Sequence, residues 1–284
     1  MARPLRIEYP GAVYHVTSRG NRKGSIFESS KDNELFLKYF SYVIKDHNWL
    51  CHAYCLMPNH YHLLIETPDG NLSAGMRDLN GNYSQGYNKN HKTVGHLFQG
   101  RYKAFLIEKE PYLLNVAQYI VLNPVRANLA KHPREWKWSS YKATAGDSKK
   151  ESWLSINWIL SYFSKKKDYA QKLYKDSIMS VVLDESPLSK VKHGAILGYQ
   201  PFIDWVWNNV TKGSESISEI TREDRILGRP TLKELFKEVS SKKHRNGLIY
   251  RAKVRCGYSI TDISKHLGLS RVTVSRILND YKLK

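Results

Sequence analysis

The stretch CLMPNHYHLLIETP, from Cys55 to Pro68, places two histidines one residue apart inside an apolar run bounded by prolines. We expect one strand over residues 49–57 and the next over residues 60–66. Side chains alternate along a strand, so His60 and His62 point to one face while Tyr61 points to the other, into the core. Two imidazoles side by side form half of a metal site, or a pair of surface or hydrogen-bonded histidines. Spacing alone leaves both readings open.

Regular elements flank this pair of strands on both sides. The pattern predicts further strands over residues 12–21 and within 95–108, and helices over residues 31–48, over residues 72–90 and from Pro111 to Pro124. This order predicts an α+β fold, with a small antiparallel sheet and helices on one of its faces. Residues 136–152 shift to small polar and charged side chains, so we place the end of a first domain, 1–145, there. Residues 146–228 are predicted to form a helical middle segment.

The last segment, residues 229–284, carries a second recognisable pattern. Thr231 and Glu234 have the spacing of a helix N-cap and its N3 partner. Further on, two short helices are predicted on either side of Gly268, with Ser270 as the cap of the second. The expected inward side chains are Ile260, Ile263 and Leu267 on the first helix, and Val274, Ile277 and Leu278 on the second. Two helices joined by a tight glycine turn are typical of a helix-turn-helix unit.

The outward side chains of the second helix are the expected base-reading positions of such a unit. They are Arg271, Thr273, Ser275 and Arg276. From residue 242 to the end there are eleven Lys and Arg against two Asp, a net charge of +9 in a small module. The alternative is a helical hairpin with a solvated basic face.

Charge and composition point to a polyanionic partner. The chain has 45 Lys and Arg against 26 Asp and Glu, a net charge of +19, and its 19 Tyr and 7 Trp offer rings on which unpaired bases stack. Three cysteines cannot form a disulfide framework. No signal peptide follows Met1, and no apolar run approaches the roughly 20 residues that span a bilayer. We therefore expect a cytoplasmic, nucleoid-associated protein without a membrane partner.

A third ligand for the histidine pair is expected near residues 117–129, AQYIVLNPVRANL. Tyr119 and Asn123 stand four residues apart, so the phenol and the amide leave one face of the predicted helix one turn apart. Imidazole and carboxamide oxygen together suit Mg²⁺ or Mn²⁺, with positions left for phosphate oxygens. A tyrosine beside such an ion can attack a phosphodiester. The alternative for Tyr119 is an ordinary core aromatic.

Zinc is the competing metal, because Cys51, His52 and Cys55 precede the two histidines. Cys51 and Cys55 are four residues apart on a predicted strand, where they share a face, and this spacing fits poorly with the Cys-x-x-Cys knuckle of structural zinc sites. We expect both cysteines to be small core residues.

Four motifs taken together, MPNHYHLLI, LFQGRYKAFLI, YIVLNPVRANL and WKWSSY, resemble the REP-associated tyrosine transposases, which are relatives of the insertion-sequence transposases in the HUH superfamily. The resemblance covers residues 9–141. It implies a ferredoxin-like nuclease core in which His60 and His62 bind the metal, Tyr119 is the nucleophile and Asn123 completes the site. Such proteins cleave and rejoin single-stranded or hairpin DNA, found in repetitive extragenic palindromes, through a 5′-phosphotyrosine link. The terminal helix-turn-helix is similar to that of replication initiators, which implies duplex DNA as a second partner.

Basic residues on or next to the predicted strands are candidates for phosphate contacts. They are Arg19, Arg22, Arg101 and Lys103, each of which is equally compatible with a solvated surface cation. Two other functions stay open at this stage: a catalytically silent DNA-binding regulator acting through the helix-turn-helix, and a structural zinc module. The sequence is compatible with a monomer or a homodimer.

Overall fold

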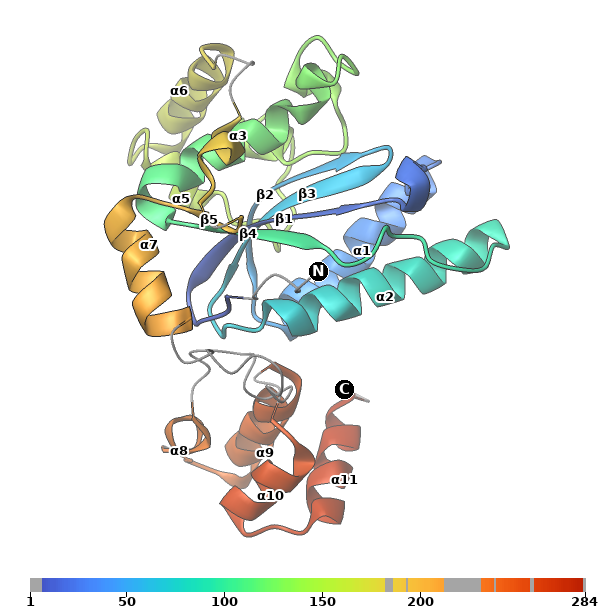
Figure 1. The fold of residues 1–284 in the computed structure, drawn as a ribbon, viewed down its shortest axis with the longest axis vertical. Coiled ribbons are helices and arrows are strands. Elements are labelled where there is room, and N and C mark those ends of the chain that lie inside the picture. The colour runs from blue at the N-terminus through green and yellow to red at the C-terminus, as the bar shows by residue number, and fades with distance from the viewer. Residues whose placement is uncertain are drawn as a thin grey trace.

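The computed structural model describes residues 7–181, 186–192, 194–211, 231–237, 239–255 and 258–282. A five-stranded sheet with the order β2-β3-β1-β4-β5 lies at the centre of the fold (Figure 1). The strands are β1 Ala12–Arg19, β2 Leu50–Met57, β3 His60–Thr67, β4 Lys103–Ile107 and β5 Ile196–Leu197. The first four pair antiparallel in the order of a ferredoxin-like sheet. The predicted α+β class is therefore confirmed.

Helices cover both faces of this sheet, which corrects the expectation of helices on one face (Figure 1). Helices α1 (Ser30–Asp46) and α2 (Leu72–His91) lie on one side. Helix α3 (Lys109–Arg126) follows β4 and crosses the other side. Its residues Leu113, Val116 and Ile120 are fully buried, so apolar burial fixes the helix on that face.

The alternation predicted for the His-Tyr-His stretch is present in β3. Tyr61 is fully buried on the α1/α2 face. Its hydroxyl donates to the Asn80 side chain over 2.6 Å, and its ring lies 4.8 Å from that of Phe36. His62 stands opposite Thr17 of β1 and opposite Cys55 of β2, on the α3 face. Tyr61 is thus a core residue, as expected.

A β-bulge in β2 overturns the expectation that Cys51 and Cys55 share a face. Cys51 pairs with Ile65 and Ala53 pairs with Leu64, so His52 is the extra residue. The extra residue shifts the alternation, and directly opposed residues share a face. Cys51 therefore points toward the α1/α2 side, whereas Cys55 points toward the α3 side. Both thiols are buried and free, and burial raises the pKa of each.

Helix α3 continues through Pro124 to Arg126, two residues beyond its predicted end. Proline has no N–H to donate to the carbonyl of Ile120, one turn earlier. The side-chain amide of Asn123 supplies donors instead, to the carbonyl oxygens of Ile120 at 3.3 Å and Tyr119 at 2.8 Å. Asn123 therefore compensates for the missing backbone donor, which explains how the helix passes the proline.

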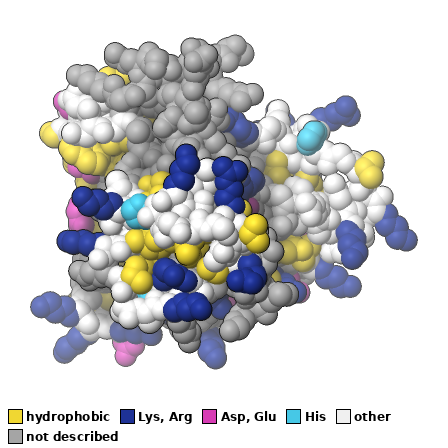
Figure 2. Space-filling model, turned by 90° about the horizontal axis from the view of Figure 1, so that it is seen from below, with side chains coloured by type: hydrophobic (Ala, Val, Ile, Leu, Met, Phe, Trp, Pro, Cys, Tyr) yellow, Lys and Arg dark blue, Asp and Glu magenta, His cyan; other side chains and the backbone are white. Residues whose placement is uncertain are grey.

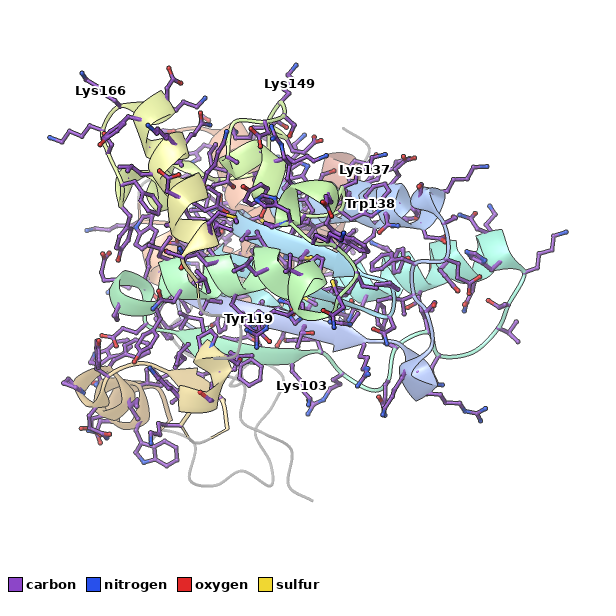
Figure 3. All side chains as sticks on the ribbon, turned by 90° about the horizontal axis from the view of Figure 1, so that it is seen from above. Lys103, Tyr119, Lys137, Trp138, Lys149 and Lys166 are labelled. Atoms are coloured by element: carbon purple, nitrogen blue, oxygen red, sulfur yellow. The ribbon has the colours of Figure 1, made fainter. Side chains whose placement is uncertain are left out.

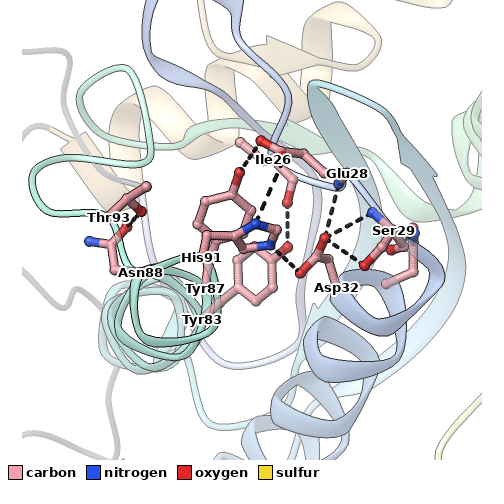
Figure 4. Close-up of polar contacts among 10 residues, drawn as sticks. Ile26, Glu28, Ser29, Asp32, Tyr83, Tyr87, Asn88, His91 and Thr93 are labelled. Atoms are coloured by element: carbon pink, nitrogen blue, oxygen red, sulfur yellow. Dashed lines mark hydrogen bonds and ion pairs between the residues drawn. The ribbon is translucent and has the colours of Figure 1, made fainter.

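A polar network ties the start of α1 to the end of α2 (Figure 4). His91 bonds Asp32 over 2.8 Å, and the Tyr87 hydroxyl donates to Glu28 over 2.6 Å. The Ser29 backbone N–H also donates to Asp32, as part of a capping box. Burial alone would raise the pKa of Asp32, but the hydrogen bonds from His91 and Ser29 outweigh it and hold this pKa below its ordinary value.

The middle segment packs into the same hydrophobic core as residues 7–145. It follows helix α4 (Tyr141–Thr144) and contains the helices α5 Asn157–Ser161, α6 Lys167–Met179 and α7 Gln200–Val206, together with strand β5. Ile159, Tyr174 and Ile203 all belong to the main core cluster. Strand β5 pairs parallel with β4, an addition to the ferredoxin-like sheet. The boundary predicted at residue 145 therefore does not separate two cores.

The C-terminal helices form a separate small core. They are α8 Leu232–Leu235, α9 Lys242–Tyr250, α10 Ile260–Leu267 and α11 Arg271–Lys282. Ile263, Val274 and Ile277 are buried together, as predicted. Gly268 has a φ of +64°, the left-handed conformation that glycine adopts most easily. The Ser270 hydroxyl accepts the backbone N–H of Thr273 over 3.0 Å and caps α11.

Candidate active site

Three histidines meet on the α3 face of the sheet, where the sequence predicted two. The His60 and His62 rings are 4.9 Å apart between centroids. The third ring belongs to His15 of β1, which is fully buried, and its centroid lies 5.0 Å from that of His62. The signal in the sequence was its alternation with Thr17 and Arg19 on a predicted strand, but the pairing of β1 with β3 is what brings it to His62.

The imidazoles are neutral at physiological pH, because burial disfavours their charged form. Burial lowers the pKa of His15 to about 3 and holds that of His62 well below its ordinary value, to which the neighbouring His15 and His60 contribute. For His60, burial and then the positive charge of Arg19 lower the pKa to about 4. Neutral imidazole is the form that binds metal ions.

Tyr119 packs edge-on against two of these rings. Its ring centroid lies 6.1 Å from that of His62 and 6.0 Å from that of His15. The side chain is half-buried, so one part of it is open to solvent. The Arg126 guanidinium lies over the Tyr119 ring, 5.1 Å from its centroid. This cation–π contact was not predicted from the sequence, and it restrains the orientation of the phenol.

The donor set suits a hard divalent cation. His60 uses Nδ1 for a contact of 2.7 Å with the Asn59 side chain, and His62 uses Nδ1 for a contact of 2.8 Å with His15. Both rings therefore have Nε2 left for a ligand. The two amide hydrogens of Asn123 go to backbone carbonyls, which leaves its Oδ1 as the atom able to bind a cation. Two imidazoles and one carboxamide oxygen fit Mg²⁺ or Mn²⁺.

No alternative cluster competes with this site in the part of the chain that the structure describes. No group of three His, Cys, Asp or Glu side chains there is arranged to hold a metal ion. Cys51 and Cys55 point to opposite faces, which argues against zinc coordination by the pair. Within the same residues, no helix is both long and apolar enough to cross a membrane.

The cations predicted near the strands divide into two groups. Arg19 stands opposite His60 in the β1–β3 register, and Lys103 stands opposite Thr17, which in turn is opposite His62. Both are exposed and share the histidine face; Figure 3 looks at the molecule from above, with Tyr119 on α3 and Lys103 on β4 labelled. Arg22 and Arg101 are exposed in the connections outside the strands. Only Arg19 and Lys103 are therefore aligned with the site by the sheet.

The four side chains of α11 that were predicted to contact bases are at least partly open to solvent. Arg271 and Arg276 are exposed, and Ser275 is half-buried. The Thr273 hydroxyl bonds that of Ser270 over 2.8 Å, so it takes part in the helix cap. Seen from the side of the C-terminal helices, Lys and Arg side chains surround a mixed polar and apolar surface (Figure 2).

Residues 9–123 match the family model described as "Transposase IS200 like", and this range contains all three histidines, Tyr119 and Asn123. This region therefore resembles the transposase domain of that family.

Two further similarities accompany this match. A Clostridium perfringens protein described as "Resolvase" is 41% identical over 70 residues, which are 25% of this chain and 32% of that protein. The chain thus spans about a third of the length of this relative. A structure titled "Structure of the REP associates tyrosine transposase bound to a REP hairpin" is similar at 18% identity with a TM-score of 0.47. That similarity covers 56% of this chain and 91% of the other.

Proposed function

We propose that this chain is a DNA strand transferase of the REP-associated tyrosine transposase kind, which cleaves and rejoins single-stranded or hairpin DNA through Tyr119. The observation that carries the proposal is the edge-on packing of the half-buried Tyr119 against His62, on the face where His60 also lies. A nucleophile and a cation site are thereby adjacent, as attack on a phosphodiester requires.

His60, His62 and Asn123 would hold Mg²⁺ or Mn²⁺ at this site. When bound, such a cation would supply polarisation of the scissile phosphodiester and stabilisation of the charge that develops during transfer. Arg126 contacts the Tyr119 ring through its guanidinium, and Arg19 and Lys103 offer positive charge for phosphates that flank the cleaved one.

The reaction is a balanced exchange of two phosphate ester bonds. The Tyr119 oxygen attacks phosphorus, a bond between them forms, and the bond to the 3′ oxygen of the preceding nucleotide breaks. The phenol proton passes to solvent and the released 3′ oxygen takes up a proton. The 5′-phosphotyrosine link retains the energy of the original ester, so rejoining by the reverse step needs no nucleotide cofactor.

An open cavity beside the turn between β2 and β3 supports single-stranded DNA as the substrate. The cavity has a volume of about 210 Å³, and its walls include Met57, Pro58, Trp136 and Trp138. Met57 stands opposite His60 in the β2–β3 register, and the remaining walls include Phe27, Glu28 and Asn33 at the start of α1. Indole rings stack on unpaired bases with little dependence on sequence.

A labelled hairpin distinguishes cleavage from binding. The full chain is incubated with Mn²⁺ and a hairpin DNA with single-stranded flanks, labelled in separate reactions at its 3′ or 5′ end. A 5′-phosphotyrosine intermediate retains the 3′ label on the denatured protein and releases the 5′ label as a shortened strand. Excess chelator should abolish both products. Retention of the 5′ label would assign the opposite polarity, and absence of any adduct with all sequences tested would refute the proposal.

A catalytically silent regulator is the second candidate, and the basic C-terminal helices favour it. Arg271 and Arg276 are exposed on α11, in a segment of net charge +9. Duplex DNA bound there is compatible with both candidates. The regulator alone predicts duplex binding that is lost in the double variant Arg271→Ala/Arg276→Ala, together with no adduct from any hairpin.

A further inference from the structure

His15 is the group on the α3 face to which the proposed chemistry gives no role. It is fully buried in the middle of β1, between β3 and β4. Its Nε2 lies 2.8 Å from Nδ1 of His62, and the planes of the two rings are inclined by 20° to each other. The other nitrogen, Nδ1, is buried and has no hydrogen-bond partner among the described residues.

A contact between two neutral imidazole nitrogens contains one proton and therefore has a direction. If His62 donates from Nδ1, its Nε2 carries a lone pair and can bind a cation. If His15 donates from Nε2, then Nδ1 of His62 is the acceptor, and the proton of His62 must sit on Nε2. In that second tautomer His62 cannot be a ligand. The partner of the second nitrogen commonly decides which tautomer a metal-binding histidine adopts.

We propose that His15 is a positioning residue, which carries its own proton on Nδ1, accepts the Nδ1 proton of His62 at Nε2 and so directs the Nε2 lone pair of His62 toward the cation. This inference rests on the proposed function, because it assigns a partner to one of the proposed metal ligands. It adds a residue of β1 to a site that the motifs place on β3 and α3.

The surroundings of His15 hold its ring in one orientation. The Phe105 ring of β4 lies 5.9 Å away and nearly parallel, while Tyr119 packs edge-on at 6.0 Å. The antiparallel register places His15 between Phe105 and Leu64, so its neighbours on the two adjacent strands are apolar. Within the described structure, His62 is the polar side chain to which His15 is bonded.

His60 has an equivalent arrangement with a different partner. Its Nδ1 lies 2.7 Å from the Asn59 side-chain oxygen, which can only accept. His60 therefore carries its proton on Nδ1 and leaves Nε2 for a ligand. With His15 as acceptor, His62 has the same tautomer, so both imidazoles offer the same nitrogen. Asn59 and His15 are then two independent supports for one pair of ligands.

Metal binding by variants of the full chain tests the role of His15 without reliance on DNA cleavage. The probe is Mn²⁺ titrated by calorimetry. His15→Leu removes the acceptor, and we expect Mn²⁺ affinity to fall by about 10- to 100-fold. His15→Gln can place an oxygen where Nε2 was, so we expect it to restore affinity to within about threefold of wild type. His47→Leu is the control, because His47 is also buried but bonds Asp78 away from the site; it should leave Mn²⁺ affinity unchanged.

The tautomer itself is measurable in the wild-type protein, which removes the risk that a variant fails to fold. The ¹⁵N shifts of labelled histidines in the Mg²⁺-loaded chain should show His62 protonated on Nδ1. Protonation on Nε2 would overturn the proposal, as would a folded His15→Leu that binds Mn²⁺ as tightly as wild type. An equal loss in His15→Gln and His15→Leu would also overturn it. Failure of the wild type to bind Mn²⁺ would instead remove the proposed metal site, and the role of His15 with it.

Discussion

Tyr61 and Tyr119 lie on opposite faces of one sheet and have opposite surroundings. Tyr61 is fully buried, bonds Asn80 and packs on Phe36, and burial raises the pKa of its hydroxyl. Tyr119 is half-buried between His62 and Arg126. The α1/α2 face is thus a closed core. On the α3 face, helix α3 covers the histidines, and its Tyr119 side chain is partly open to solvent. The α1/α2 face contributes to stability, and the α3 face carries the proposed site.

The largest expected difference is between Tyr119→Phe and Tyr61→Phe. Tyr119→Phe lacks the proposed nucleophilic oxygen. It should bind hairpin DNA normally, but the rate of covalent adduct formation should fall by a factor on the order of 10⁴ or more. Tyr61→Phe should form the adduct normally and lose about 1 kcal/mol of unfolding free energy with its hydrogen bond. Denaturing gels and urea unfolding measure the two effects. Persistent adduct in Tyr119→Phe would show that another residue is the nucleophile.

Phe36→Ala tests whether the α1/α2 face serves stability alone. The cavity left beside Tyr61 and Phe40 should lower the free energy of unfolding by about 3–5 kcal/mol. Mn²⁺ affinity of the folded variant should not change, since the cation site lies across the sheet. The control on the same helix is Tyr42→Ala, because Tyr42 is 51% exposed and its loss should change stability by less than about 0.5 kcal/mol. Weakened Mn²⁺ binding in folded Phe36→Ala would mean that the two faces are coupled.

Asp32→Asn should lower the free energy of unfolding by about 2 kcal/mol at pH 7, because it weakens the charged hydrogen bonds to His91 and Ser29. The folded pKa of Asp32 lies below its ordinary value of 3.8. The stabilising contribution is therefore complete above that value and is lost as pH falls through the folded pKa. The difference between wild type and variant should shrink in acid, as measured by urea unfolding from pH 7 to pH 3. Glu34→Gln, an exposed position on the same helix, should show no such difference.

Lys103→Gln should give the smallest effect, and it tests whether Lys103 on the α3 face contacts a DNA phosphate. If Lys103 contacts one phosphate, its loss should reduce the slope of log affinity against log salt by about 0.7 for single-stranded DNA. Lys89→Gln provides the comparison, because Lys89 is exposed near the end of α2 on the other side of the sheet. Filter binding of hairpin DNA at several salt concentrations measures both slopes. Equal slopes for Lys103→Gln and wild type would exclude the contact.

Local patterns in the sequence predicted most of the sheet and the main residues of the site. The alternation in β3 assigned Tyr61 to the core and His62 to the other face, because alternation is a property of a single strand. The i, i+4 spacing likewise placed Tyr119 and Asn123 on one face of a helix.

Features that depend on contacts distant in the sequence were missed. The bulge at His52, which separates the faces of Cys51 and Cys55, depends on how β2 pairs with β3. The role of His15 depends on the β1–β3 register. The continuation of α3 past Pro124 depends on the side chain of Asn123, because proline alone predicts an end. The two residues of β5 are too few to give a pattern, and only their pairing with β4 defines them as a strand.

Pairing with β5 has a consequence for any attempt to isolate the motif-bearing part of the chain. The backbone N–H groups of Leu106 and Glu108 donate to Ala195 at 2.7 Å and Leu197 at 2.8 Å. On the opposite edge, Leu56 donates to Trp138 at 2.8 Å. A fragment ending at residue 145 would retain all three histidines and Tyr119 but expose the outer side of β4. Unpaired strand edges invite strand addition from other molecules, so such a fragment should self-associate, whereas the chain through residue 211 protects that edge itself.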